Sequence, residues 1–185
     1  MNAAFKEWEV VVEALGRGDQ IVIMRRGGLD EGPNGFEVMH QKFWLFPTRF
    51  HQQSEMVVPE AMRDRLPSGP AGNDPATVSI QFACEVVTHL ELSRIDQIAR
   101  LRGQHVWKDE VLIKRMTSGD RNSLHALLVR VFKLQDPRSM PMHGDYAGCK
   151  SWTQLHSAPN ESKLQPVLDD ASFKQKALAF EQAIQ

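Results

Sequence analysis

The sequence predicts an α+β protein built on a small mixed β-barrel that is partly closed, or on a curled sheet. Two observations predict this class. Several strand patterns follow one another without helices between them, which argues against a doubly wound parallel sheet. Helical periodicity occurs near both ends of the chain and once between strands. We therefore expect an N-terminal helix, one internal helix and a C-terminal helix around the strands.

The composition is that of an ordinary globular protein. The chain has 185 residues, 42% of them hydrophobic and 24% charged, and a chain of this length buries enough surface to fold without a metal or a disulfide. Its two cysteines lie far apart and match no zinc-ligand spacing, so we expect free thiols in a reducing compartment. No apolar run has the length of a membrane span, and the acidic N-terminus does not resemble a signal peptide. We expect a cytoplasmic protein with no membrane partner.

The charge is nearly balanced overall but uneven along the chain. A net charge of −1 argues against generic nucleic-acid binding. Residues 94–150, however, contain eleven Lys and Arg against six Asp and Glu, a local net charge of +5. This segment is either a patch that faces phosphate groups or a solvated face, and the sequence leaves both interpretations open.

The first half of the chain is expected to contain a helix and a β-hairpin with a long loop. Residues 3–15 place five apolar side chains on one helical face, and the glycines of GRGD end that helix. Residues 20–24 form a short β-branched strand, and residues 36–46 form a second strand that ends before Pro47. The turn-rich segment between these strands indicates the hairpin. A weak helix is expected over residues 54–66.

The second half is expected to supply the rest of the sheet. Residues 77–92 predict one long strand, or two with a bend, and residues 124–134 predict a central strand. Residues 93–103 predict a helix with a serine N-cap and a terminal glycine. Residues 105–116 are interpreted as a broken strand. A capped amphipathic helix is expected from Asp169 onward.

One domain accounts for most of the chain. We expect residues 1–157 to form a single α+β domain and residues 158–185 to form a linker and a helix packed on it. The segment 67–75, rich in Pro and Gly, is expected to be a flexible surface loop, and residues 136–146 a further loop.

Several motifs make the chain similar to a bacterial family, the domain of unknown function 1802 (DUF1802). In order, they are KEWEVVVEALGRGDQIVIMRRGG, FWLFPTRFHQ, RVFKL and YAGCKSW, and together they extend over nearly the whole chain. The positions that match the family's pattern are Arg25, Arg26, Gly27, Gly28, Pro47, Thr48, His51, Gln52, Gly148, Cys149, Ser151 and Trp152. The resemblance implies no particular activity, and no catalytic role is carried over with it.

The first candidate site follows the strand at residues 20–24. Arg25 and Arg26 supply guanidinium forks for a phosphate, and Gly27 and Gly28 let backbone N–H groups approach an anion. The motif lacks the Lys-Ser/Thr pair of a Walker loop and is not a dinucleotide fingerprint. The alternative is a tight turn that carries exposed arginines.

The second candidate site is PTRFHQ, at the end of the next predicted strand. Pro47 makes a rigid turn, so Thr48, His51 and Gln52 are expected at a strand end, where proteins often place ligand-binding side chains. The alternative is a loop histidine bonded to the backbone.

A metal set can be drawn from the same region. Glu37, His40 and His51 are candidate ligands, but their spacing matches no established metal motif. We expect no bound metal and no other cofactor.

The third candidate site combines a tryptophan with cations. Trp107 lies between His105 and Lys108, with Arg115 further along, and these are the ingredients of a base-stacking surface. The alternative is a tryptophan that fills the core. In YAGCKSW, no activating signature accompanies Cys149, so a structural cap is favoured over a nucleophile.

Together the motifs predict a module that binds a nucleic acid or a nucleotide-like anion. The expected ligand-binding residues, at the mouth of the barrel, are Arg25, Arg26, Gly27, Gly28, Thr48, His51, Gln52, Trp107 and Arg115. An analogy with PUA-like barrels supports this placement. One alternative is a divalent-metal-dependent nuclease or phosphodiesterase that uses Glu37, His40, His51 and Glu110. A non-catalytic scaffold or subunit is the other, and a protein partner is left open.

Overall fold

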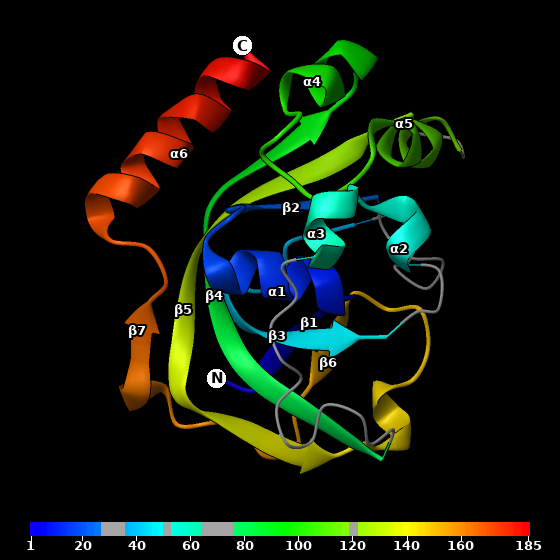
Figure 1. Ribbon diagram of the computed structural model, residues 1–185. Helices are drawn as coiled ribbons and strands as arrows, with labels where there is room; N and C mark the ends of the chain where they lie inside the picture. The colour runs from blue at the N-terminus through cyan, green and yellow to red at the C-terminus, as the bar shows by residue number, and fades with distance from the viewer. Residues whose placement is uncertain (27–35, 50–52, 64–75, 119–121) are drawn as a thin grey trace.

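One mixed sheet of seven strands curls strongly around helix α1 in the computed structural model, which describes residues 1–26, 36–49, 53–63, 76–118 and 122–185 (Figure 1). The strands are β1 (Ala3–Trp8), β2 (Val22–Arg25), β3 (Lys42–Thr48), β4 (Thr77–Leu92), β5 (Leu124–Pro141), β6 (Trp152–Gln154) and β7 (Leu164–Pro166). The helices are α1 (Glu9–Arg17), α2 (Gln53–Met56), α3 (Pro59–Arg63), α4 (Ile95–Arg100), α5 (Asp109–Thr117) and α6 (Asp170–Ile184), with short 3₁₀ turns η1 (Gly144–Tyr146) and η2 (Glu161–Lys163). The predicted α+β class with a curled sheet is confirmed.

The strand order explains the curl. It runs β2-β5-β4-β3-β1-β6, and β7 pairs with another part of β5. β1 and β3 are parallel, whereas the other pairs are antiparallel. The register of β4 against β5 shifts between Ile80 and Phe82 and again between Val86 and Thr88. Such irregularities bend a strand and increase its twist, so the two longest strands can wrap around the interior.

Helix α1 fills the interior of the curl because it is apolar on nearly every side. Its buried apolar residues are Val10, Val11, Val12, Ala14 and Leu15. Gly16 lies against the ring of Phe82 so closely that a Cβ atom at this position would overlap the ring. Gly18 ends the helix with φ = 75°, a conformation that glycine adopts without steric cost.

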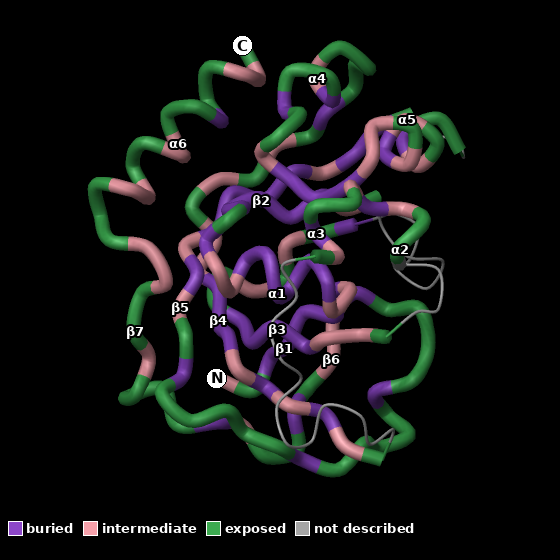
Figure 2. The backbone as a smooth tube through the Cα atoms, in the orientation of Figure 1, coloured by how far each residue is buried: buried purple, intermediate pink, exposed green. Residues whose placement is uncertain are grey.

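The core lies on both faces of the sheet. The larger cluster contains α1 and the inner face of the strands, and it extends to α4, α5 and α6. A smaller cluster around Trp44, Phe46, Ile80 and Tyr146 lies on the other face. Figure 2 accordingly shows buried backbone through the centre and exposed backbone along α6 and the lower rim.

The C-terminal segment is anchored to the sheet at two places. β7 pairs with β5, and Phe180 of α6 is fully buried against the larger cluster. The division at residue 157 stays a prediction, and the predicted loop 67–75 lies outside the described residues. Among the residues that the structure describes, no helix is both long and apolar enough to cross a membrane.

Several predicted elements are confirmed. The strand over residues 77–92 is β4, and the strand over residues 124–134 is part of β5. The internal helix is α4, and the C-terminal helix begins at Asp170 after the N-cap Asp169, whose side chain accepts a hydrogen bond from Ser172 N. The weak helix over residues 54–66 corresponds to the short helices α2 and α3, as far as the described residues extend.

The predicted helix over residues 3–15 is partly wrong, because its first part is strand β1. β1 has a neighbour on each side, β3 and β6, and five of its six residues are buried. A central strand covered on both faces shows no polar alternation. Its apolar residues therefore also fit the spacing of a helical face, and the helix actually begins at Glu9.

The predicted hairpin between residues 20–24 and 36–46 is wrong. β2 pairs with β5, whereas β3 pairs with β1 and β4. The second strand also begins later than predicted, at Lys42, although Phe36 is buried and contributes to the core. Strands that are neighbours in sequence are not neighbours here, because long-range pairing with the long strands β4 and β5 determines their positions.

Two further predictions need correction in the second half. Residues 105–116 are not a strand, because residues from Asp109 onward form α5, with Leu112 and Met116 buried one turn apart and acidic residues in the first turn. Acidic side chains stabilise a helix N-terminus. Residues 136–146 are not all loop, since β5 continues to Pro141 along β4.

Candidate functional site

A buried carboxylate, that of Glu7, lies near the end of β1, just before helix α1 begins. Glu7 is 1% exposed, and its Oε1 atom accepts a hydrogen bond from Trp8 N at 2.7 Å. Its Oε2 atom is buried and has no hydrogen-bond partner among the described residues. Burial raises the pKa of Glu7, while the nearby charges of Arg25 and Arg115 act in the opposite direction. The parallel neighbour β3 contributes Thr48, whose hydroxyl donates to the Glu7 carbonyl oxygen at 3.1 Å.

Arg25, the last residue of β2, reaches the same region from another strand. Its Nε atom donates to Ser151 Oγ at 2.8 Å, and its guanidinium carbon lies 5.3 Å from the centroid of the Phe5 ring. Ser151 is fully buried, so the arginine is held in a defined orientation. Arg25 is an electrostatic neighbour of Lys6, Glu7 and Arg115, which makes it the common member of this group of charges.

Arg115 is positioned by α5 above two tryptophan rings. Its guanidinium carbon lies 3.9 Å from the ring centroid of Trp107 and 5.2 Å from that of Trp8. The two rings contact each other edge to face, with centroids 4.7 Å apart. Burial lowers the pKa of the Arg115 guanidinium, and the Glu7 carboxylate partly offsets this effect. We call Glu7, Trp8, Arg25, Trp107 and Arg115 the Arg25–Arg115 cluster.

Lys6 adds a third cation beside the cluster. It is buried, and its Nζ atom donates to the carbonyl oxygen of Gly148 at 2.6 Å. Burial lowers its pKa, and the charges of Arg25 and Lys150 add to that shift, whereas Cys149 opposes it. Cations therefore outnumber carboxylates in this part of the described structure. The arrangement is suited to an anionic group, because a phosphate or carboxylate would balance the excess charge.

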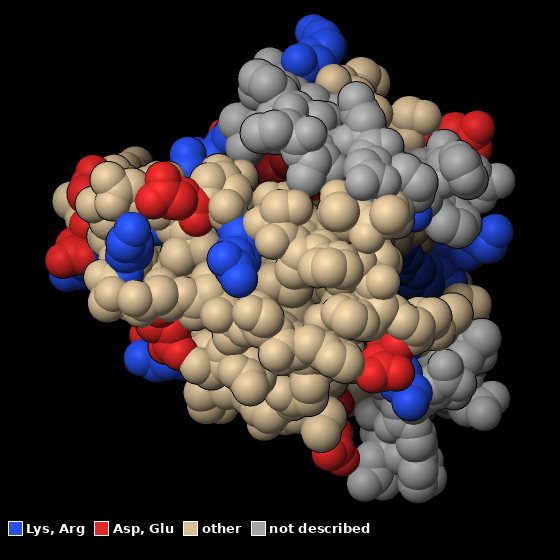
Figure 3. Space-filling view, turned by 90° about the horizontal axis from the view of Figure 1, so that it is seen from below, with Lys and Arg blue, Asp and Glu red and all other residues tan. Residues whose placement is uncertain are grey.

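Positive charge is concentrated locally and does not cover a whole face. The end of the molecule seen from below in Figure 3 shows Lys and Arg side chains separated by broad uncharged surface. In addition, many arginines of the +5 segment are paired with acids: Arg94 and Arg100 both contact Asp96, and Arg130 contacts Asp170. The local excess around Arg25 and Arg115 is thus the more informative electrostatic feature.

The structure brings together four of the nine predicted ligand-binding residues. Arg25, Thr48, Trp107 and Arg115 all surround Glu7 or its neighbour Trp8. Arg26 is exposed and donates to Ser118 Oγ at the end of α5, at 3.1 Å. The remaining predicted residues, Gly27, Gly28, His51 and Gln52, lie outside the described residues.

Trp107 is part of the core and is not a free stacking platform. The ring is 1% exposed and lies between Trp8 and the guanidinium group of Arg115. The expectation that a base stacks on Trp107 is therefore wrong for this structure. The physical reason is that α5 folds back over the ring, an arrangement that the predicted strand at residues 105–116 excluded.

The candidate metal set is not assembled in the described part of the chain. Glu37 is exposed, and its backbone carbonyl accepts a hydrogen bond from Trp152 Nε1 at 3.0 Å. The His40 ring packs on the Trp152 ring, with centroids 5.3 Å apart. His51 lies outside the residues that the structure describes. Among the described residues, no group of three or more His, Cys, Asp or Glu side chains is close enough to hold a metal ion.

Sequence reasoning missed the residues of β1. Glu7, Trp8 and Lys6 were assigned to a helix, where they would have pointed in unrelated directions. The signal that could have revealed them is the sequence AAFKEW itself, in which two charged residues interrupt an apolar run directly before a helix. Ser151 was identified as a position that matches the family pattern, and its buried hydroxyl contact with Arg25 follows only from the pairing of β1 with β6.

The comparisons with known proteins give one family match and a similarity to solved structures of one protein. A family model described as a domain of unknown function, DUF1802, matches residues 4–179. No curated protein matches the sequence. The crystal structure of ASCH from Zymomonas mobilis is similar at a TM-score of 0.49 and 12% identity, over 96% of this chain and 93% of that chain. A tyrosine-to-phenylalanine mutant of the same protein has a TM-score of 0.48 at 13% identity, over 96% of both chains.

Proposed function

The chain belongs to the DUF1802 family, and we propose that it is a binding module for a nucleic acid or a nucleotide-like anion, with the Arg25–Arg115 cluster as its phosphate-binding site. One observation carries this proposal. The half-buried guanidinium groups of Arg25 and Arg115 lie near a single carboxylate, that of Glu7, and the buried ammonium group of Lys6 is a further charged neighbour of Arg25.

The charge balance of the cluster favours an anionic ligand. A buried charge is costly unless an opposite charge or hydrogen bonds compensate it. Burial shifts the pKa of Lys6 and of Arg115 downward and the pKa of Glu7 upward, so all three groups are held where their charged forms are disfavoured. A phosphate placed between Arg25 and Arg115 would relieve this cost, and the planar fork of arginine suits phosphate oxygens.

The surroundings favour a nucleotide-containing ligand over a free phosphate. The half-buried ring of Trp8 lies beside Arg115 and offers a surface for a base or sugar, in place of the fully buried Trp107. The exposed Arg26, which donates to Ser118 Oγ at the end of α5, directly follows Arg25 and adds a cation for further phosphates. We therefore expect a strand of nucleic acid to bind more tightly than inorganic phosphate.

Fluorescence anisotropy with labelled oligonucleotides tests this function. Single- and double-stranded RNA and DNA are titrated at two salt concentrations, because phosphate contacts make affinity salt-dependent. The variants Arg25→Gln and Arg115→Gln remove one charge each. Arg138→Gln is the matched control, since this arginine is exposed on β5 and makes no contact with the cluster. We expect each cluster variant to weaken binding by roughly fivefold to tenfold and the control to bind as the wild type does.

The same titrations distinguish the alternatives. They are run first with EDTA and then with Mn²⁺, and the oligonucleotides are checked for cleavage. Cleavage that requires the metal would favour the phosphodiesterase alternative, for which the described residues provide no ligand set. No binding under any condition, or equal loss in the control variant, would contradict the proposed function and favour a protein partner.

A further inference from the structure

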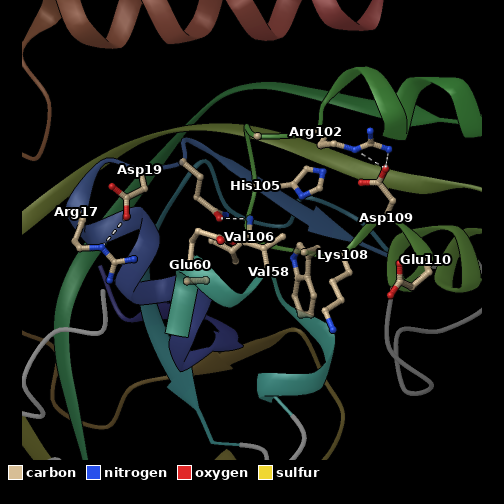
Figure 4. A pocket seen from close by; sticks show the side chains of 14 residues that line it. Arg17, Asp19, Val58, Glu60, Arg102, His105, Val106, Lys108, Asp109 and Glu110 are labelled. Atoms are coloured by element: carbon tan, nitrogen blue, oxygen red, sulfur yellow. Dashed lines mark hydrogen bonds and ion pairs between the residues drawn. The ribbon is translucent and has the colours of Figure 1, made fainter. Parts of the chain in front are cut away.

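A cavity of about 640 Å³ is lined in part by Trp107, a member of the Arg25–Arg115 cluster. Figure 4 shows ten of its other lining residues with labels. The cavity is bounded by the end of α1, by α3, by the segment between α4 and α5, and by the first turn of α5. The volume is within the range of small-molecule sites, about 300–1,000 Å³. Sequence patterns do not predict this cavity, because its walls come from three separate segments of the chain.

Five charged residues at the rim of the cavity form ion pairs. Arg17 Nε lies 2.6 Å from Asp19 Oδ2, and Arg102 Nε donates to Asp109 Oδ2 at 2.9 Å. Figure 4 shows these two pairs on opposite sides of the opening. A third acid at the rim, Glu60, is paired with Arg63. Among the charged lining residues that the structure describes, the four acids Asp19, Glu60, Asp109 and Glu110 outnumber the three bases Arg17, Arg102 and Lys108. This balance favours an uncharged ligand over an anion.

Two nitrogen-bearing rings in the wall lack hydrogen-bond partners. His105 is 6% exposed, and neither of its ring nitrogens makes a hydrogen bond of ordinary geometry among the described residues. The same holds for Nε1 of Trp107, which is 1% exposed. By contrast, the amide of Gln20 is fully used, since it donates to Val22 O at 2.8 Å and accepts from Val106 N at 3.0 Å. Buried polar atoms usually have partners, so the two rings point to a missing ligand.

The chemistry of these rings defines the class of ligand. Burial lowers the pKa of His105, while the charge of Asp109 and polar backbone groups of Trp107 and His105 beside the ring act against that shift. The ring is therefore neutral near pH 7 and carries one N–H donor and one nitrogen acceptor. The indole of Trp107 adds a second donor, and Ala61 and Val106 supply apolar surface. A flat heterocycle with a donor next to an acceptor complements this wall.

We propose that this cavity binds one uncharged heterocycle of the nucleobase class, free or as a nucleoside, with His105 and Trp107 recognising its hydrogen-bonding edge. Of the Arg25–Arg115 cluster, only Trp107 takes part in this recognition, and none of the charged groups of the cluster does. The proposal therefore does not depend on the proposed function and would stand if oligonucleotide binding failed.

Nuclear magnetic resonance of the histidine rings tests the proposal directly. Long-range ¹H–¹⁵N spectra report the tautomer and hydrogen bonding of His105 while adenosine, guanosine, cytidine and uridine are added one at a time. We expect at least one nucleoside to shift the His105 ring nitrogens in a saturable manner. His105→Phe, which keeps a ring but removes both nitrogens, should weaken that binding by roughly tenfold or more. The control is His156→Phe, an exposed histidine away from the cavity.

Each result decides the proposal. If no nucleoside shifts the His105 nitrogens at millimolar concentration, or if His105→Phe binds as well as the wild type does, the proposal is wrong. Should His105→Phe fail to fold, the wild-type titration still decides, and His105→Gln, which retains a donor and an acceptor, should keep most of the affinity. Arg25→Gln separates the two sites, because it should weaken oligonucleotide binding and leave nucleoside binding unchanged.

Discussion

The guanidinium group of Arg115 lies 3.9 Å from the ring centroid of Trp107, and this contact joins helix α5 to the centre of the molecule. Trp107 precedes α5 by two residues, and Arg115 is two residues from its end. The helix therefore folds back over its own leading segment. Through this contact the guanidinium group of Arg115 is held near the Glu7 carboxylate, and the ring of Trp107 also forms part of the wall of the cavity.

The Arg115–Trp107 contact should contribute measurably to stability. Cation–π pairs contribute about 0.5–1 kcal/mol when exposed and about 2 kcal/mol when removed from water. We expect a double-mutant cycle of Arg115→Met and Trp107→Leu to give a coupling energy of about 1 kcal/mol in urea unfolding. Arg138→Met combined with Trp107→Leu is the control and should show no coupling. A coupling near zero for the first pair would mean that the ring does not hold the guanidinium.

Replacement of Glu7 should change how stability depends on pH. The folded-state pKa of Glu7 is raised above its usual value of 4.5 by burial. Its contribution to stability is therefore fully present below that value and is lost as the pH rises through the folded-state pKa. Because glutamine does not ionise, Glu7→Gln should gain stability relative to the wild type as the pH rises from 4 to 8.

Urea unfolding at several pH values measures this difference for Glu7→Gln. Glu60→Gln, at an exposed position on α3, is the control and should follow the wild type. The same Glu7 variant should also bind oligonucleotides more tightly, by roughly twofold to fivefold, because one negative charge is removed beside two arginines. If the unfolding free energies of Glu7→Gln and the wild type change in parallel with pH, the burial inferred for Glu7 is wrong. If Glu7→Gln binds oligonucleotides more weakly than the wild type does, the inferred charge balance of the cluster is wrong.

The buried His105 should reduce stability at acidic pH. Burial lowers its folded-state pKa below the usual 6.5, so protons bind preferentially to the unfolded chain. The corresponding stability is present above pH 6.5 and is lost as the pH falls toward the folded-state pKa. His105→Gln should remove this part of the acid sensitivity in thermal unfolding between pH 5 and 7.5, whereas His156→Gln should not. Identical pH profiles for His105→Gln and the wild type would show that the histidine is not held neutral.

The contact of Gly16 with Phe82 should make this glycine intolerant of a side chain. A methyl group at position 16 would overlap a ring that is 2% exposed and has little room to move. Overpacking of this kind costs about 1–3 kcal/mol. We therefore expect Gly16→Ala to lower the unfolding free energy by that amount. Gly144→Ala is the control, since nothing lies within 4 Å of a Cβ there, and equal losses in the two variants would contradict the packing.

Local patterns predicted the strands that dominate the sheet. β4 and residues 124–134 of β5 were predicted because these segments are rich in β-branched and apolar residues, whereas the continuation of β5 to Pro141 was not predicted. α6 was predicted from its N-cap and its apolar spacing. In each of these cases the local conformational preference agrees with the tertiary environment. The pattern of neighbouring residues is therefore enough to predict the element.

Prediction failed where tertiary packing overrides local preference. β1 was mistaken for a helix because a doubly covered strand has no alternation, and α5 was mistaken for a strand because only two of its residues are fully buried. The same two errors affected the site. Glu7 lies on β1 and Arg115 on α5, so their meeting across Trp8 and Trp107 could not be inferred from either segment alone.

The sequence by itself determined which chemistry this protein has available: an arginine at a strand end, a tryptophan with nearby cations, a largely apolar first helix and an α+β order of elements. Only the tertiary structure decided how those groups combine. It buried Trp107, placed Arg25 and Arg115 around an unforeseen carboxylate, and left His105 beside a cavity. The physical reason is that side-chain identity is a local property, whereas burial, charge balance and unsatisfied hydrogen bonds depend on residues that the fold brings together from distant parts of the chain.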